Sequence, residues 1–208
     1  MASTIIHLAV AKELENKLSI RNQYDYYLGA IAPDISKQIG KSKYESHFLK
    51  NSYNENVPNI ELFVSKYPDF KFFSFDLGYF IHLYTDKIWF EEFMETITTS
   101  NAIKLLDGTI INTSEEEIKN IIYSDYTNIN TSVIDEYSLD LSLFYEDFKV
   151  PETKINEIPV ENLDILINKM GIIIENSKEE KHYSIDIDII KNFISTTCEK
   201  ILTELKKY

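Results

Sequence analysis

The chain has 208 residues, 44% of them hydrophobic, and a formal net charge of −13. That length suits one domain with a substantial core. Only 5 glycines and 5 prolines occur, too few for the many tight turns of an all-β protein. So acidic a chain is not expected to present a basic surface for nucleic acid or to bind anionic membranes electrostatically.

The single cysteine, Cys198, excludes an intramolecular disulfide, which is typical of a reducing compartment. The first residues lack a basic region and become charged at Lys12 and Glu13. We therefore expect neither a signal peptide nor a transmembrane segment. Together these features predict a soluble cytoplasmic protein.

Helical periodicity predicts an all-α fold, a single-domain bundle of about eight helices over residues 1–208. The first helix is expected over residues 3–18, with His7 near its apolar face. The second is expected over residues 22–32, because Pro33 disfavours helical angles in the residue before it.

A long polar loop is expected over residues 35–57, with a short turn inside it that holds His47. A short helix over residues 58–67 and a long central helix over residues 71–98 follow. Within the central helix, Asp76 is interpreted either as a surface residue or as a hydrogen-bond partner of a ligand histidine.

In the C-terminal half, Asp107 and Gly108 predict the turn of one small hairpin over residues 103–112. The remaining elements are a helix over residues 113–128 with a break before residue 131, helices over 160–176 and 185–206, and a charged loop over 177–181. We expect a metal-binding half at about residues 3–98 and a helical half at about residues 113–208.

The apolar, aromatic stretch over residues 76–90 contains His82 and Asp86. Residues four apart lie on one face of a helix, one turn apart, so both can hold the same metal ion. Burying a carboxylate there is costly unless a cation or hydrogen bonds offset its charge. Asp34 and His47 could complete a set of two imidazoles and two carboxylates, which zinc accepts. The alternative interpretation of each histidine is a hydrogen-bonded core residue.

Four segments follow one another along the chain: a first helix with His7, Gly29-Ala-Ile-Ala-Pro-Asp34, Ser46-His47-Phe48, and Gly78-Tyr-Phe-Ile-His82-Leu-Tyr-Thr-Asp86. In this order and context they resemble the zinc-dependent phospholipase C family, within a superfamily shared with zinc-dependent single-strand nucleases. The resemblance extends over about residues 3–95.

This resemblance implies zinc as the cofactor, with one or two ions, although other divalent transition metals suit the same donors. It implies that Asp34, His47, His82 and Asp86 hold one ion. His7 would then bind a neighbouring ion that shares Asp86, or would support a ligand. The implied reaction is hydrolysis of a small-molecule or lipid phosphodiester by metal-activated water, with Asp34 and Asp86 as catalytic residues.

In the family, a further ion uses two histidines and a glutamate downstream of the motif that ends here at Asp86. After Asp86 this sequence offers only His182. The further site is therefore expected to be absent or rebuilt from carboxylates, for which the candidates are Glu91, Glu92 and Asp125.

Two functions stay open at this point. The first is a metal-dependent phosphoesterase that resembles phospholipase C. The second is a non-catalytic metal-binding helical protein, in which a structural or regulatory ion ties residues 35–57 to the bundle. A phosphohydrolase of the HD type is disfavoured, because the sequence contains no His-Asp dipeptide.

Overall fold

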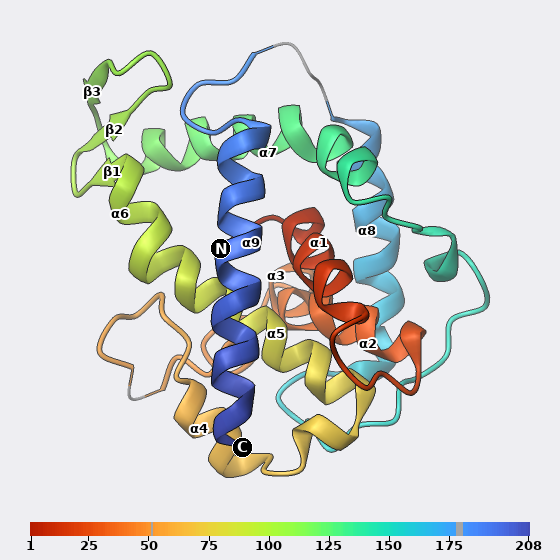
Figure 1. Cartoon of the computed structure of the whole chain (residues 1–208). Helices are drawn as coiled ribbons and strands as arrows, with labels where there is room; N and C mark the ends of the chain where they lie inside the picture. Colours follow the sequence, from red (N-terminus) through yellow and green to blue (C-terminus); the bar gives the residue numbers. More distant parts are fainter. Residues whose placement is uncertain (51, 178–180) are drawn as a thin grey trace.

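The computed structural model describes residues 1–50, 52–177 and 181–208. Within them, the helices of seven or more residues are α1 (Thr4–Glu15), α2 (Gln23–Ile31), α4 (Ile60–Lys66), α5 (Ser74–Ile88), α7 (Glu115–Glu136), α8 (Leu163–Glu175) and α9 (Ile187–Glu204). The single-turn helices are α3 (Ile35–Gln38) and α6 (Met94–Ile97). The predicted all-α fold is confirmed (Figure 1). Residues 178–180 of the predicted charged loop lie outside the described residues.

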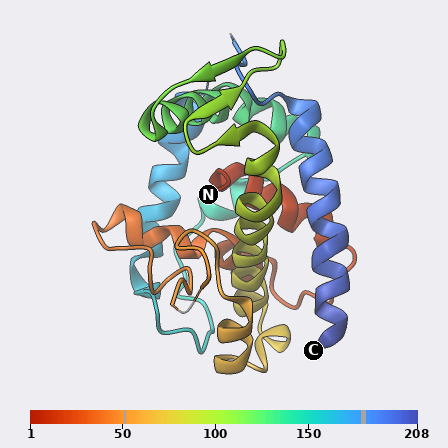
Figure 2. The same ribbon diagram turned by 90° about the vertical axis from the view of Figure 1, so that its left-hand side faces the viewer.

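Helix α5 lies at the centre of the bundle, where α1, α2, α4 and α9 all pack against it (Figure 1). Every residue from Phe75 to Asp86 is buried, and a helix that is buried on all sides belongs in a protein interior. After α5 the chain passes through a π-helical turn at Trp89–Phe93 into α6. The predicted central helix is thus one rod, and Figure 2 shows it rising to the small sheet.

Helices α2 and α5 touch through their backbones. A Cβ atom added at Gly29 in α2 would lie 2.1 Å from the carbonyl oxygen of Phe75. One added at Gly78 in α5 would lie 2.1 Å from the carbonyl oxygen of Tyr26. No side chain fits at such a distance, so this approach requires glycine at both positions. The contact brings the end of α2 beside the middle of α5.

The segment after α2 differs from the sequence prediction. Helix α2 ends at Ile31, but Pro33 does not end the helical structure. Residues Ala32–Asp34 form a 3-10 turn (η1) with the proline at its start, where the missing N–H needs no partner. Helix α3 then continues to Gln38. The prediction of a loop from residue 35 was therefore wrong for the residues of α3.

The predicted hairpin is confirmed and belongs to a three-stranded sheet of β1 (Thr98–Thr99), β2 (Ala102–Lys104) and β3 (Ile110–Asn112). β2 and β3 pair antiparallel, with Lys104 opposite Ile110. Gly108 in the turn has a φ of +86°, which favours glycine. The predicted break in the next helix is wrong, because α7 runs without interruption through residue 131.

Both predicted halves share one hydrophobic core, to which residues from α1 through α9 contribute. Helix α9 packs against α1 and α5 and covers one side of the bundle (Figure 1). The Sγ atom of Cys198 in α9 lies 3.7 Å from the carbonyl oxygen of Val10 in α1. Among the helices of the described residues, none combines the length and apolar composition that crossing a bilayer requires.

Asp76, in the first turn of α5, matches neither interpretation made from the sequence. It is 1% exposed and accepts a hydrogen bond from the hydroxyl of Thr153. The imidazole of His82 is bonded instead to the carbonyl oxygen of Ala30. Burial raises the pKa of Asp76 to about 6, although the Thr153 hydrogen bond opposes this shift.

We expect Asp76→Asn to raise the Tm at about pH 8. A carboxyl with a higher pKa in the folded than in the unfolded state destabilises the fold as the pH rises from about 4 to about 6. The gain in Tm should therefore shrink as the pH is lowered through that range, which thermal denaturation at several pH values measures. A gain of the same size throughout the range would show that ionisation of Asp76 is not its cause.

We expect Gly78→Ala to destabilise the protein by at least about 2 kcal/mol, because the new methyl group overlaps the backbone of α2. Gly171→Ala in α8 is the matched control, since the nearest atom to its Cβ is the hydroxyl of Tyr145 at 3.4 Å. Alanine favours a helix over glycine, so this control should gain up to about 1 kcal/mol. Urea denaturation measures both changes, and equal effects would contradict the close contact between α2 and α5.

Candidate metal centre

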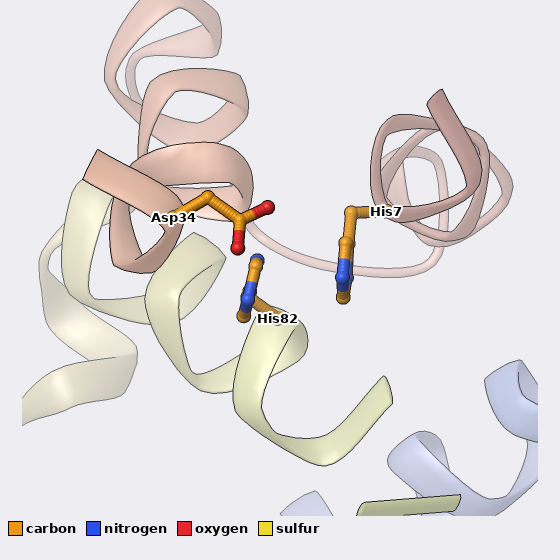
Figure 3. Close-up of side chains that lie close together, drawn as sticks. All are labelled: His7, Asp34 and His82. Carbon is orange, nitrogen blue, oxygen red and sulfur yellow. The ribbon is translucent and has the colours of Figure 1, made fainter. Parts of the chain in front are cut away.

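All five residues predicted to bind metal meet inside the bundle. His7 comes from α1, Asp34 from η1, His47 from a turn between α3 and α4, and both His82 and Asp86 from α5. Their exposed fractions are 0% for His7, His82 and Asp86, 2% for His47 and 7% for Asp34. Figure 3 shows three of them, His7, Asp34 and His82, lying close together from three separate elements. We call these five residues the His/Asp cluster.

The donor atoms of the cluster are spaced like ligands of one ion. The Nε2 atoms of His47 and His82 are 3.3 Å apart. Oδ2 of Asp86 lies 3.6 Å from the first and 3.7 Å from the second. Oδ1 of Asp34 lies 3.7 Å from Nε2 of His47. Two ligands that are each about 2.0–2.1 Å from a tetrahedral zinc ion are about 3.3 Å from one another, so the observed spacing is close to that of a zinc shell.

Two polar partners orient the imidazoles. Nδ1 of His82 lies 2.8 Å from the carbonyl oxygen of Ala30, so Nδ1 carries the proton and Nε2 presents a lone pair to the cluster. Nδ1 of His47 lies 2.9 Å from Oγ of Ser46, whose hydroxyl donates to the carbonyl of Lys43. The same tautomer therefore follows for His47. Two lone pairs that face each other at 3.3 Å repel unless a cation lies between them.

His7 extends the cluster on one face of His82. Its ring stacks on the His82 ring, with centroids 3.7 Å apart and planes inclined by 10°. Its Nε2 lies 3.4 Å from Oδ1 of Asp86, and the same oxygen accepts a 3.0 Å hydrogen bond from the backbone N–H of Ala2. Asp86 thus faces His7 with one oxygen, and His47 and His82 with the other.

The electrostatic environment favours the protonation states that bind a cation. Burial, and then the neighbouring His7, lower the pKa of His82 to about 3, so its imidazole is neutral near pH 7. Burial alone would raise the pKa of both carboxyls. The imidazoles beside them, His47 for Asp34 and His7 for Asp86, hold each pKa below its usual value. Ionised carboxylates and neutral imidazoles are the forms that ligate a metal.

Several buried atoms of the cluster have no hydrogen-bond partner among the described residues: both ring nitrogens of His7, Oδ1 of Asp34 and Oδ2 of Asp86. A buried polar atom without a partner costs about 1–3 kcal/mol. The described residues include two overlapping sets whose ligand atoms lie within 4.8 Å of one another, namely His7, Asp34 and His82, and His47, His82 and Asp86. A bound cation would satisfy these atoms, so the residues present fit a metal ion.

The acids predicted as replacements for a further site make other contacts. Glu91 and Glu92 each pair with a nearby lysine. Asp125 accepts 4 hydrogen bonds from the loop over residues 183–185 and so anchors that loop to α7. His182, beside the same loop, belongs to neither of the sets that could hold an ion among the described residues.

A cleft of about 990 Å³ reaches the cluster at Asp34 and His47. The other three residues of the cluster do not line it, so solvent approaches the cluster from this side. Part of the cleft is apolar and comes from the rod of α5 and α6 and from α7: Trp89, Phe90, Met94, Ile118, Ile122, Tyr123 and Tyr126. The cleft therefore combines an apolar surface with buried side chains able to bind a metal ion.

Sequence reasoning identified the five clustered side chains but missed the groups that hold them. The carbonyl of Ala30 and the N–H of Ala2 are backbone groups, which leave no signal in a side-chain pattern. Ser46 directly precedes His47 and was a weak signal that the imidazole has a hydroxyl partner. Lys43, which lines the cleft nearby, gave none.

A family model described as zinc dependent phospholipase C matches residues 4–208. The match includes the C-terminal half, beyond the segments that carry the resemblance in the sequence. This family is zinc-dependent, and the described residues contain His/Asp sets able to bind a metal ion. No curated protein and no solved structure matches the chain.

We expect the purified protein to contain zinc, and we expect His82→Ala and Asp34→Ala to lose most of it, because each removes a donor from the cluster. His182→Ala is the control, since it removes an imidazole outside the cluster. Elemental analysis gives the zinc content, and circular dichroism shows whether each variant is folded. Equal zinc content in all four proteins would contradict a metal site at the cluster.

Proposed function

The chain belongs to the zinc-dependent phospholipase C family, and on that basis we propose that it hydrolyses phosphodiesters at the cleft over Asp34 and His47. The observation that carries this proposal is that the cleft reaches two residues of an otherwise buried cluster. A catalytic metal site keeps an open position for water or substrate, whereas a structural site is closed by protein.

In the proposed site, Asp34, His47, His82 and Asp86 hold one zinc ion, and His7 with Asp86 holds or supports a second. When bound, zinc supplies a Lewis acid that lowers the pKa of water and offsets negative charge on phosphoryl oxygens. Hydrolysis adds the oxygen of water to phosphorus and breaks the P–O bond to one alcohol. One proton of the water goes to the departing alcohol and the other to solvent, which leaves a phosphomonoester.

Asp34 is the carboxylate best placed to act on water from the cleft. It lines the cleft, and its Oδ1 has no hydrogen-bond partner among the described residues. Its pKa lies below the usual value, because the imidazole of His47 outweighs the effect of burial. With Oδ1 on the ion, the second oxygen of the ionised carboxylate would accept a hydrogen bond from water and direct the water oxygen at phosphorus. An ionised carboxylate on the ion suits orientation of the water better than removal of its proton.

Asp86, the second predicted catalytic carboxylate, lies deeper, is 0% exposed and does not line the cleft. Its oxygens face His7 on one side and His47 and His82 on the other. We therefore assign Asp86 to holding the ions rather than to contact with the substrate. The apolar surface of the cleft suits the hydrocarbon part of a lipid substrate.

A structural or regulatory ion is the alternative function, and the burial of the cluster favours it. The cluster joins the turn that holds His47 to α5, which would tie the loop after α3 to the bundle. A measurement of phosphodiester hydrolysis distinguishes the two functions, because a structural ion needs no open position for water or substrate.

We expect the zinc-loaded protein to hydrolyse bis(p-nitrophenyl) phosphate, with loss of activity in a chelator and recovery on addition of zinc. Asp34→Asn should lower kcat by about 100-fold or more, because a neutral amide replaces the ionised carboxylate that is proposed both to hold zinc and to orient the water. Glu95→Gln, in the cleft but outside the cluster, should retain activity. A folded, zinc-replete protein that cleaves neither this diester nor a short-chain phospholipid would favour the structural ion.

A further inference from the structure

The segment between Asp34 and His47 places three lysines on the cleft. Lys37, Lys41 and Lys43 all line it. The whole chain has 34 acidic against 21 basic residues, so three cations within one short segment reverse the charge locally. The same segment joins two of the proposed zinc ligands, which sets these cations beside the reacting centre.

No carboxylate of the described residues pairs with these three lysines. The fourth lysine of the cleft, Lys119, differs, because its ammonium lies 2.8 Å from the carboxylate of Glu115. Most other lysines that the structure shows in ion pairs lie on the outer surface of helices. The cations of the segment over residues 37–43 are therefore available to a negatively charged ligand.

Two of these lysines lie against aromatic rings of the cleft. The Nζ atom of Lys43 lies 5.3 Å from the ring centroid of Phe90, and that of Lys37 lies 5.1 Å from the ring centroid of Tyr123. Proteins bind quaternary ammonium groups on aromatic faces. The rings of Phe90 and Tyr123 already hold ammonium groups of the protein, which repel a second cation.

Lys43 is the best-positioned of the three. It is half-buried, and its ammonium donates a 3.1 Å hydrogen bond to Oδ1 of Asn56. Its carbonyl accepts a hydrogen bond from the hydroxyl of Ser46, whose Oγ contacts the imidazole of His47. Both ends of Lys43 are thus fixed beside the cluster, so its charge is held in place before a ligand arrives.

We propose that the cleft selects phosphoesters whose head group is negatively charged, and that Lys43 and Lys37 determine this selectivity. The phosphate would lie at the cluster, and the second anion would meet the two ammonium groups. Glu55 and Glu95 also line the cleft, but both are exposed to water, which screens their repulsion. Lys37 is exposed as well, so the half-buried Lys43 is expected to contribute the larger share of the preference. The proposal rests on the proposed function for the reaction, but the binding preference can be measured without turnover.

The test uses three phosphomonoesters that share one phosphate and differ in the charge of the head group. The head group of 3-phosphoglycerate carries a carboxylate, that of glycerol 3-phosphate is neutral, and that of phosphorylcholine carries a quaternary ammonium. Isothermal titration calorimetry of the zinc-loaded protein should give affinities that fall in that order. We expect a difference of at least about tenfold in Kd between the first and the last, which shrinks at high salt.

The variants identify the residues responsible. Lys43→Met and Lys37→Met should each weaken binding of 3-phosphoglycerate more than binding of phosphorylcholine, while the zinc content stays unchanged. Lys43→Arg should keep the preference, because the charge is retained. Lys119→Met is the matched control, since this lysine lines the cleft but is already paired with Glu115.

Equal or tighter binding of phosphorylcholine would overturn the proposal. So would an equal loss for all three ligands in both Lys→Met variants, because the lysines would then contact only the shared phosphate. Where Lys43→Met loses zinc or fails to fold, Lys37→Met decides the matter. If the affinities follow the predicted order but the protein cleaves no phosphodiester, the proposed function is refuted and the proposed selectivity is supported.

Discussion

The burial of the Asp86 carboxylate in the middle of the central helix is the constraint around which this structure is arranged. It is 0% exposed and ends the stretch of α5 from Phe75 to Asp86, in which every residue is buried. An ionised carboxylate is tolerated in such a place only when its charge is offset. One oxygen of Asp86 accepts a hydrogen bond from the backbone N–H of Ala2 and lies beside His7. The other oxygen faces the Nε2 atoms of His47 and His82 and has no hydrogen-bond partner among the described residues, so a cation bound there would offset its charge. Segments far apart in the chain therefore converge on one point of α5.

The contact between α2 and α5 sets the geometry of this convergence. Gly29 and Gly78 let the two backbones touch, which brings the carbonyl of Ala30 within 2.8 Å of the imidazole of His82. This packing contact thus orients the His82 imidazole and positions the 3-10 turn that carries Asp34. Core packing and site geometry are coupled here. A shift between the two helices would move Ala30 and Asp34 relative to His82 and Asp86.

The sequence was most informative where two metal-binding residue types are separated by one helical turn. The spacing of His82 and Asp86 predicted their shared face, and the donor preference of zinc suggested Asp34 and His47 as partners. The resemblance to the zinc-dependent family supported this set and added His7. The helical turn after Pro33 was missed, because a proline also fits the start of a new turn. The orientation of the lysines in the following loop was equally out of reach. It depends on contacts between α3, the loop, the rod of α5 and α6, and α7, which no local pattern records.

The loop between α3 and α4 supplies residues that line the cleft, which bears on the choice between a structural and a catalytic ion. His47 and Lys43 belong to one hydrogen-bonded turn, joined through Ser46. An ion that fixes His47 therefore also fixes the position from which the Lys43 ammonium faces the cleft. In the proposed function, tying the loop to the bundle and building a charged substrate site would both follow from the same coordination. A structural contribution from the ion is therefore compatible with the catalytic interpretation, because an ion that holds His47 against α5 would also hold a turn that lines the cleft.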